Sequence, residues 1–469
     1  MHNMDQEKAK RAQSLKVIVS EAVMVVAVII TVIVLALIVS GYWLNSDFKV
    51  ERQGLLQISS IPTGATVDID GDSDWLQRTN TSKVLSRGQH TISLSKEGYD
   101  TWSRTIDIRE GLLYRVHYPR LFLKDRKIEK TIDLTSVGYS VVSPNHNTVL
   151  ITNLTTEWQA LSLDEEKTTS QKIDISKLSS FVSAPEEGPA SFIGHIEKAN
   201  WAKDNAHILL KTLNNDEVEW LLLNIDNVDK SINLSKEFAA KFDDVQIVNN
   251  SANSLLVLQD HNMRKIDVAN KQISAILIEN VVSFDHYENE IIAVAKVADA
   301  EEYSLQSLNL GDNKTIVLDK LSNPAQVTIS RFYDDKYITL LNGAQVNLYK
   351  ETDFEPVADF ELNFVPEYIK VGHDGEFITM YAGANIATLD MEAQAIAEWQ
   401  IESANFGWID NDMIYVIHDE NLIVYDFDGL NRRIISAKVS DSFPVTITED
   451  KWLYYCSSGQ LMREWLIPR

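Results

Sequence analysis

The chain has a single cysteine, Cys456, among its 469 residues. One cysteine excludes an internal disulfide, and no cysteine pair is present that could hold a structural metal. A domain outside the cytoplasm would then depend on core burial alone, which a large all-β domain can provide. Cys456 ends the strand-like run that begins at Trp452, so we expect it to be a small core residue rather than a reactive thiol.

Sequence signatures of catalysis and cofactor binding are also missing. The ten histidines are scattered, and no two have a metal-binding spacing such as His-Glu-x-x-His. No Gly-x-Ser-x-Gly elbow and no glycine-rich phosphate loop before a helix is found. We therefore expect no catalytic, cofactor-binding or metal-binding residues. A site assembled from residues far apart in sequence would leave no such motif.

Basic residues are scarce in the C-terminal part of the chain. The whole sequence has 43 Lys and Arg against 68 Asp and Glu, but residues 125–469 hold 28 basic and 55 acidic residues, a net charge of −27. This excess argues against nucleic acid as a partner, since its binding rests on Lys and Arg contacts to phosphate. It mainly brings solubility, although it could also attract cations or basic partners. The abrupt change near residue 125 indicates a domain boundary.

Only one long apolar run is present, from Ala22 to Val39. As a helix it would span roughly 27 Å, close to the thickness of a bilayer's hydrocarbon core. Tyr42 and Trp43 follow at the depth that aromatic rings favour. Basic residues precede it at Lys8, Lys10, Arg11 and Lys16.

This pattern predicts a cytoplasmic tail (1–16), a single-pass transmembrane helix (17–43) and a connector (44–53), with the rest of the chain outside the membrane. The lipid bilayer would then be one partner. A cleaved signal peptide is the alternative, with Val39-Ser40-Gly41 as a weak cleavage site, but its apolar core would be shorter.

Residues 54–124 have the alternating pattern of short strands. Ala65, Val67 and Ile69 share one face, and Asp70-Gly71 supplies turn chemistry. A second run opens at Gly88 and alternates through Leu94. No helical period occurs, so we expect a small β-sandwich.

This segment resembles the PEGA family of small extracytoplasmic β domains. The resemblance rests on Pro62-Thr63-Gly64-Ala65, Val67-Asp68-Ile69-Asp70-Gly71, Arg87-Gly88-Gln89-His90-Thr91-Ile92 and Lys96-Glu97-Gly98-Tyr99. The family's tetrad has Glu where this chain has Thr63, and the usual Thr-Pro is replaced near Thr81-Ser82. The resemblance implies a surface or envelope module without catalytic residues.

Four alternating carboxylates, Asp68, Asp70, Asp72 and Asp74, could bind calcium. An EF-hand loop needs glycine at its sixth position and glutamate at its twelfth, and neither register supplies them. We expect a solvated hairpin tip.

Residues 125–469 contain a repeat. Apolar runs recur at intervals of about 36 to 59 residues, and they begin at Val149, Ile208, Leu255, Ile291, Tyr337, Phe377, Met413 and Trp452. Polar turns and partner runs follow, as at Trp220–Leu223, Tyr303–Leu305, Val346–Tyr349 and Leu422–Tyr425. Such periods are typical of propeller blades. We expect each run to be the first strand of its blade, so eight runs favour eight blades, with seven as the alternative.

The last repeat, which ends at Trp465-Leu466-Ile467, has only three strands. Lys127 to Leu134 resembles an outermost strand such as Ser231–Leu234, and it would complete the last blade and close the ring. The longest break in the repeat, Ser183 to Gly194, is a candidate for part of a binding surface, although a plain solvated loop is the simpler interpretation.

Several tryptophans could line a sugar-binding surface, but we expect them to pack in the blade cores: Trp158, Trp201, Trp220, Trp399, Trp408, Trp452 and Trp465. The fold class expected is thus all-β, a PEGA-like sandwich (54–124) and a propeller (125–469), after one transmembrane helix.

Three functions fit these features. The favoured one is a non-catalytic envelope protein that binds an unknown protein, peptide or glycan. A propeller hydrolase or lyase acting on envelope glycans or peptides is weakened by the missing motifs. A surface sensor is weakened by the short tail. Fold alone does not decide between them.

Overall fold

The computed structural model describes residues 23–36, 42–44, 50–134, 137–153, 157–164, 167–174, 195–214, 217–248, 251–372, 374–441 and 443–466. The chain divides into two compact units, Met1–Leu121 and Phe122–Arg469. Each unit is described by itself.

The predicted transmembrane segment, residues 17–43, is described as a helix only over residues 23–36. Its large apolar side chains are 46 to 63% exposed. Among the described residues, no helix has both the length and the apolarity needed to cross a membrane. The tail 1–16 and the loop Ser183 to Gly194 lie outside the described residues.

Unit 1 contains a three-stranded and a four-stranded sheet, preceded by a two-stranded pair of β1 (Tyr42–Leu44) and β2 (Val50–Arg52). The first sheet has the order β6 (Thr81–Leu85), β3 (Gly54–Ile58), β9 (Leu113–Val116), and the second has the order β5 (Asp72–Arg78), β4 (Thr66–Ile69), β7 (Gly88–Ser95), β8 (Trp102–Ile108).

The core of unit 1 draws side chains from both sheets, as a sandwich requires. Leu56 and Ile58 of β3 and Ile92 and Leu94 of β7 are 0% exposed. They alternate along their strands with more accessible residues, because successive side chains point to opposite faces. The predicted sandwich is therefore confirmed.

Unit 2 contains, among its described residues, eight four-stranded antiparallel sheets, here called blades. The first four are blade 1, β11 (Tyr139–Val142), β12 (Thr148–Thr152), β13 (Trp158–Ser162), β14 (Thr169–Ile173); blade 2, β15 (His195–Trp201), β16 (His207–Asn214), β17 (Glu217–Asn224), β18 (Ile232–Asn233); blade 3, β19 (Asp244–Ile247), β20 (Ser254–Gln259), β21 (Asn262–Asp267), β22 (Gln272–Ile273); and blade 4, β23 (Val281–Tyr287), β24 (Glu290–Lys296), β25 (Tyr303–Asn309), β26 (Lys314–Leu321).

The other four are blade 5, β27 (Gln326–Phe332), β28 (Asp335–Asn342), β29 (Gln345–Lys350), β30 (Glu355–Glu361); blade 6, β31 (Tyr368–Val371), β32 (Phe377–Ala382), β33 (Asn385–Asp390), β34 (Ala395–Gln400); blade 7, β35 (Phe406–Trp408), β36 (Met413–His418), β37 (Asn421–Asp426), β38 (Arg433–Ala437); and blade 8, β39 (Thr446–Thr448), β40 (Trp452–Ser457), β41 (Gln460–Trp465), β10 (Ile128–Asp133). A short 3₁₀ turn, Val228–Lys230, and α3, Leu234–Glu237, flank β18.

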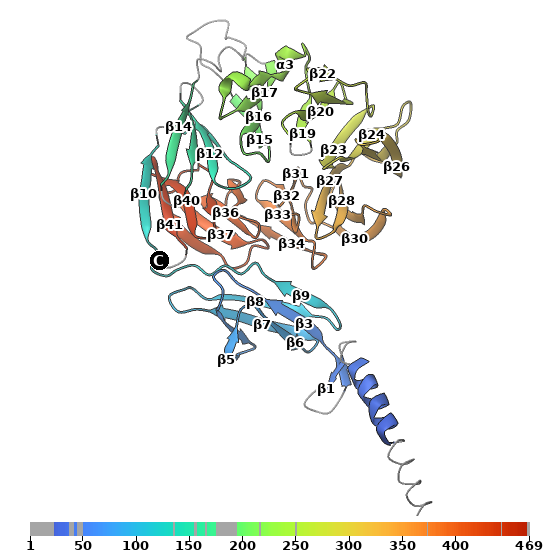
Figure 1. Ribbon diagram of the computed structural model, residues 1–469, viewed down its shortest axis with the longest axis vertical. Coiled ribbons are helices and arrows are strands. Elements are labelled where there is room, and N and C mark those ends of the chain that lie inside the picture. Colours follow the sequence, from blue (N-terminus) through green and yellow to red (C-terminus); the bar gives the residue numbers. More distant parts are fainter. Residues whose placement is uncertain are drawn as a thin grey trace, which may run out of the picture. The chain divides into compact units, whose positions relative to one another are not determined.

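The blades follow one another around a ring (Figure 1). A separate apolar cluster fills the interface of every neighbouring pair of blades, from blades 1 and 2 through blades 7 and 8. An eighth cluster joins blade 8 to blade 1, with Trp452 and Tyr454 packed beside Val149 and Leu161. Unit 2 is therefore a closed, propeller-like ring, and the apolar runs favoured this number of blades.

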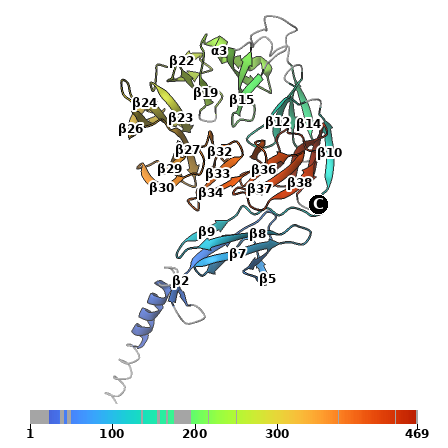
Figure 2. The same cartoon turned by 180° about the vertical axis from the view of Figure 1, so that it is seen from behind.

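One detail of the prediction was wrong. The eight apolar runs are the second strands of their blades, not the first, as in β12, β16 and β20. The second strand lies between two neighbouring blades and is buried on both faces, so it is apolar without alternation. The innermost strands are more polar because they line the ring axis (Figure 2).

The predicted closure is confirmed. β10 pairs antiparallel with β41, so a strand from the start of unit 2 completes the blade formed by its end. Glu129 accepts a hydrogen bond from Nη2 of Arg463 at 2.9 Å, and Arg126 lies 3.1 Å from the buried carboxylate of Glu464. A ring closed in this way exposes no inner sheet edge at the junction.

Candidate binding site at the ring axis

The turns that join each inner strand to the second strand lie on one face of the ring, because all inner strands run in the same direction. Aspartates brace several of these turns. Oδ1 of Asp204 accepts the backbone N–H groups of Ala206 and His207, both at 2.9 Å. Oδ1 of Asp410 accepts those of Asp412 and Met413 at 2.9 and 2.8 Å. This face, the turn face, therefore holds a set of firmly shaped loops.

A hollow of about 420 Å³ opens on the turn face, and we call it the axial hollow. Its lining comes from four blades and consists of Lys203 of blade 2, Tyr287 of blade 4, Ile329, Ser330, Arg331 and Tyr333 of blade 5, and Val371, Gly372, Asp374 and Gly375 of blade 6. Blades 2 and 6 stand opposite each other in a ring of eight. A hollow that touches both must lie at the axis.

Two cations face this hollow in a unit that is otherwise strongly acidic. Arg331 is hydrogen-bonded to the Tyr287 hydroxyl, and this contact raises the pKa of the guanidinium. Its Nε donates to the carbonyl of Tyr333 at 3.0 Å, and its Nη2 lies 3.6 Å from Asp334, whose side chain is fully exposed. Lys203 makes no ion pair with any described residue. Both cations thus retain capacity for an anionic ligand.

Ser330 and Gly375 show how tightly the hollow is built. Ser330 is 2% exposed, and its hydroxyl has no hydrogen-bond partner among the described residues. Gly375 has a φ of +80°, and a Cβ there would lie 2.1 Å from the carbonyl oxygen of Arg331. Only glycine lets the β31–β32 loop approach the backbone of β27 this closely.

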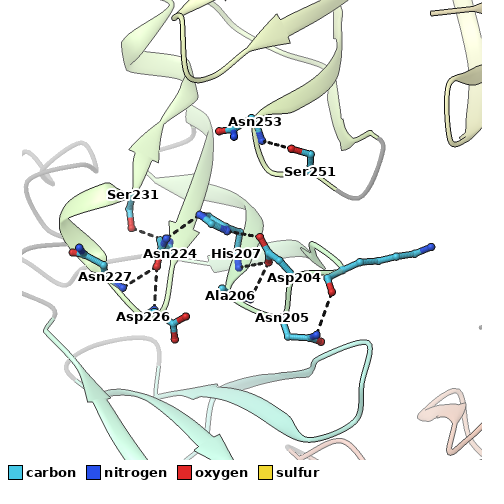
Figure 3. A network of polar contacts seen from close by, with 11 residues as sticks. Asp204, Asn205, Ala206, His207, Asn224, Asp226, Asn227, Ser231, Ser251 and Asn253 are labelled. Carbon is cyan, nitrogen blue, oxygen red and sulfur yellow. Dashed lines mark hydrogen bonds and ion pairs between the residues drawn. The ribbon is translucent and has the colours of Figure 1, made fainter. Parts of the chain in front are cut away.

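The loop that carries Lys203 is held by a network of polar side chains (Figure 3). Nδ1 of His207 lies 2.7 Å from Oδ2 of Asp204, and Nε2 lies 2.9 Å from Nδ2 of Asn224. Oδ1 of Asn224 accepts the N–H groups of Asp226 and Asn227, which fixes its amide nitrogen toward His207. Nε2 of His207 therefore accepts from the Asn224 amide, which leaves Nδ1 to donate to Asp204.

Asp204 is the charged member of this network. Burial would raise the pKa of its carboxyl, but hydrogen bonds from Ala206, His207 and the imidazole outweigh that effect and lower it. The carboxylate thus stays ionised and anchors the turn. Asn205 completes the turn, since its Nδ2 donates to the carbonyl of Lys203 at 3.2 Å.

The acidic stretch of unit 1 is a hairpin tip, as predicted. Asp70 and Gly71 both have positive φ between β4 and β5, and Oδ1 of Asp68 accepts the N–H of Gly71 at 2.9 Å. Asp70 contacts Nδ1 of His90 at 2.6 Å and accepts the N–H of Thr91, so both of its carboxylate oxygens are used in contacts within unit 1. Hydrogen bonds from Thr91 and His90 lower the pKa of Asp70.

The tryptophans are mainly core residues, as expected. Trp158, Trp220, Trp452 and Trp465 are at most 9% exposed. Trp201, Trp399 and Trp408 are half-buried; the first two pack against blade-interface clusters, and Trp408 stacks on Phe377 with ring centroids 6.1 Å apart. Cys456 is 2% exposed, and burial raises the pKa of its thiol, which fits a core role.

The residues of the axial hollow were not found from the sequence. A signal was nevertheless present, because each polar lining residue lies a few positions before the second strand of its blade. Lys203 precedes Ile208, Tyr333 precedes Tyr337, and Gly375 precedes Phe377. Once the apolar runs are assigned to second strands, the residues just before them map to the turn face.

Comparison with known families identifies the smaller unit. Residues 53–120 match the PEGA domain. The match agrees with the resemblance carried by the motif residues. In the PEGA domain the Pro62–Ala65 segment is structural, since the N–H groups of Gly64 and Ala65 donate to the hydroxyl of Thr79 at 2.8 and 3.1 Å.

Known structures similar to this chain have low sequence identity. Hsv2 of Kluyveromyces lactis is 8% identical, with a TM-score of 0.43, over 65% of this chain and 98% of that one. Dihydro-heme d1 dehydrogenase NirN is 11% identical, with a TM-score of 0.41, over 64% and 66%. An oligogalacturonate lyase of Vibrio parahaemolyticus is 10% identical, with a TM-score of 0.37, over 56% and 87%. No curated protein matches the chain.

Proposed function

We propose that this chain is a membrane-anchored, non-catalytic binding protein of the bacterial cell envelope, and that its propeller-like unit binds a carboxylate-bearing peptide segment of an envelope protein at the axial hollow. The observation that carries the proposal is the convergence of Lys203 and Arg331 with Tyr287 and Tyr333 from three blades. Binding residues concentrate on loops held by a rigid scaffold, as here.

The chemistry of the hollow supports an acidic ligand. A guanidinium and an ammonium bind carboxylates through charge-assisted hydrogen bonds. Tyr333 is 57% exposed and its ring lies against that of Phe332, with centroids 4.3 Å apart, so a ligand in the hollow would meet the exposed part of the ring. A hollow of about 420 Å³ accepts one or two side chains, whereas the rest of a peptide would cross the surrounding turns. Asp374 also lines the hollow, and its negative charge would favour a ligand whose carboxylate lies away from it.

Titration calorimetry of the full-length protein in detergent tests this proposal, with a hexaglutamate peptide and its hexaglutamine counterpart as probes. The acidic peptide should bind and the neutral one should not. Exchanging either Lys203 or Arg331 for Gln should weaken binding at least tenfold. Lys241→Gln removes an equal charge from an 89% exposed side chain that does not line the hollow, and it should have no effect. Binding of an acidic oligosaccharide in place of the peptide would change the ligand class, and turnover of either probe would contradict the non-catalytic role.

The location is tested separately. The apolar run Ala22–Val39, with basic residues before it, supports an anchor with the N-terminus in the cytoplasm. Protease added to intact cells should remove residues beyond about 45. Protection of the C-terminal part until lysis would contradict this orientation, and a mature N-terminus near Tyr42 would indicate a cleaved signal peptide.

A further inference from the structure

Three charged side chains form a cluster between blades 4 and 5, close to the axial hollow. Lys336 of β28 donates to Oε2 of Glu290 on β24. Glu351 follows β29, and its backbone N–H donates to the carbonyl of Lys336 at 2.9 Å. Its side chain is hydrogen-bonded to the same Glu290 carboxylate. Ser307 donates to Oε1 of Glu290 at 3.5 Å. The Glu290 side chain is only 13% exposed.

Two carboxyl groups here share one cation, so they cannot both be ionised without repulsion. The hydrogen bond to Glu290, together with burial, raises the pKa of Glu351 to about 7. Burial would also raise the pKa of Glu290, but the hydrogen bonds from Glu351 and Lys336 lower it. Below about pH 7, Glu351 therefore holds a proton that it donates to the Glu290 carboxylate, and above that pH the proton is lost.

The strand register connects this cluster to the hollow. Tyr287 and Glu290 are directly opposite each other in the β23–β24 hairpin, and Arg331 and Lys336 are directly opposite in the β27–β28 hairpin. Opposite residues of an antiparallel pair point to the same face. The contacts Tyr287–Arg331 and Glu290–Lys336 therefore bridge the same two hairpins side by side.

We propose that the Glu290–Lys336–Glu351 cluster sets the spacing of Tyr287 and Arg331, and so makes ligand binding at the axial hollow depend on pH. This inference rests on the proposed binding function. With Glu351 protonated the cluster is neutral and holds the hairpins together. Loss of the proton leaves a net negative charge and two repelling carboxylates next to Arg331.

Glu288, in the β23–β24 turn, is the other charged group that acts on Lys336, and it adds to the repulsion when Glu351 ionises. The expected result is weaker binding of an acidic ligand as the pH rises through about 7. The hexaglutamate probe is acetylated at its N-terminus, so all its titratable groups are carboxyls with pKa values of about 4, and a change in its affinity between pH 6 and pH 8 reports on the protein.

The test measures hexaglutamate affinity of the full-length protein at pH 6 and pH 8 by titration calorimetry. We expect a loss of about fivefold or more at pH 8 for the natural sequence. Glu351→Gln keeps a neutral donor toward Glu290, so the affinity should stay at its pH 6 value. Glu361→Gln, at the exposed end of β30, should keep the natural pH response. Glu290→Gln removes the other carboxylate of the cluster and should also abolish the pH response.

The outcomes separate the two proposals. Equal affinity at both pH values, or a pH response that survives in Glu351→Gln, would overturn the regulation and leave the binding function standing. No binding at either pH would overturn both. A stability difference between Glu351→Gln and the natural chain that grows from pH 6 to pH 8 would support the cluster's titration without reference to any ligand.

Discussion

Nε2 of His207 accepts a hydrogen bond from the amide of Asn224, at 2.9 Å. The donor belongs to β17 and the acceptor to β16, so the contact ties the ends of two strands to the turn that presents Lys203 (Figure 3). The side-chain oxygen of Asn224 accepts two backbone N–H groups, so its nitrogen must point toward His207.

We predict that Asn224→Ala lowers the free energy of unfolding by about 1–3 kcal/mol, since it leaves these backbone groups and the imidazole without partners. Asn224→Asp replaces the donor with an acceptor and would require a proton on Nε2 of His207. Denaturant unfolding and the nitrogen-15 shifts of His207 check the two results. The control is Asn262→Ala, because the Asn262 amide donates only to a backbone carbonyl in an exposed hairpin. This substitution should lower the free energy of unfolding by less than about 0.5 kcal/mol.

The ring closure should depend on pH through Glu129. Hydrogen bonds from Arg463 and Lys127 lower the pKa of Glu129 to about 2. A carboxyl whose pKa is lowered in the folded state adds stability above its unfolded value, near 4.5, and that stability is lost as the pH falls toward about 2. The contact is partly solvated, so we expect a contribution of about 1–2 kcal/mol.

Glu129→Gln should therefore be less stable than the natural chain at pH 7, and the difference should shrink toward zero near pH 2. Chemical denaturation at several pH values measures this. A constant difference across that range would mean that the substitution acts through packing rather than through the charge of Glu129.

Gly375→Ala should destabilise the fold by about 2–4 kcal/mol, because the new methyl group would overlap the carbonyl of Arg331 and the backbone would have to shift. Gly383→Ala is the matched control. Its φ is also positive, at +56°, but nothing lies within 4 Å of the added Cβ, so it should cost only about 1 kcal/mol. Thermal unfolding of both variants separates overlap from backbone strain.

Tyr333→Gly should separate stability from binding. Tyr333 has a φ of +52° in the two-residue turn between β27 and β28, which is unfavourable for an aromatic residue. Glycine removes this strain but also the contact of the Tyr333 ring with Phe332, so the free energy of unfolding should change by less than about 1 kcal/mol in either direction. Hexaglutamate affinity should fall at least fivefold. Unchanged affinity would show that the ring takes no part in the site.

Local pattern predicted much of the fold. The alternation around Val67 and Ile92 reports strands with one buried face, and the apolar runs such as Leu255–Val257 report strands buried on both. The closing strand could be inferred because a three-stranded last repeat leaves an edge that needs a partner. The position of these runs as second strands could not be inferred, because an apolar run gives no information about its order in the sheet.

The axial hollow had no counterpart in any local motif. Lys203 and Arg331 are 128 positions apart in numbering, and only the ring geometry brings them to one hollow. The raised pKa of Glu351 has the same origin, since Glu290 lies on the neighbouring blade. Sequence patterns report what each strand buries, whereas these relationships depend on how blades face each other.

The closing strand also sets an order of events during synthesis. Glu129 and Arg463 are 334 residues apart, so the ribosome makes β10 long before its partner strand β41 exists. At about 5–20 residues per second, β10 must wait roughly 15–70 seconds with an unpaired edge. The exposed charged residues of β10, Lys130 and Asp133, discourage pairing with other chains during this interval.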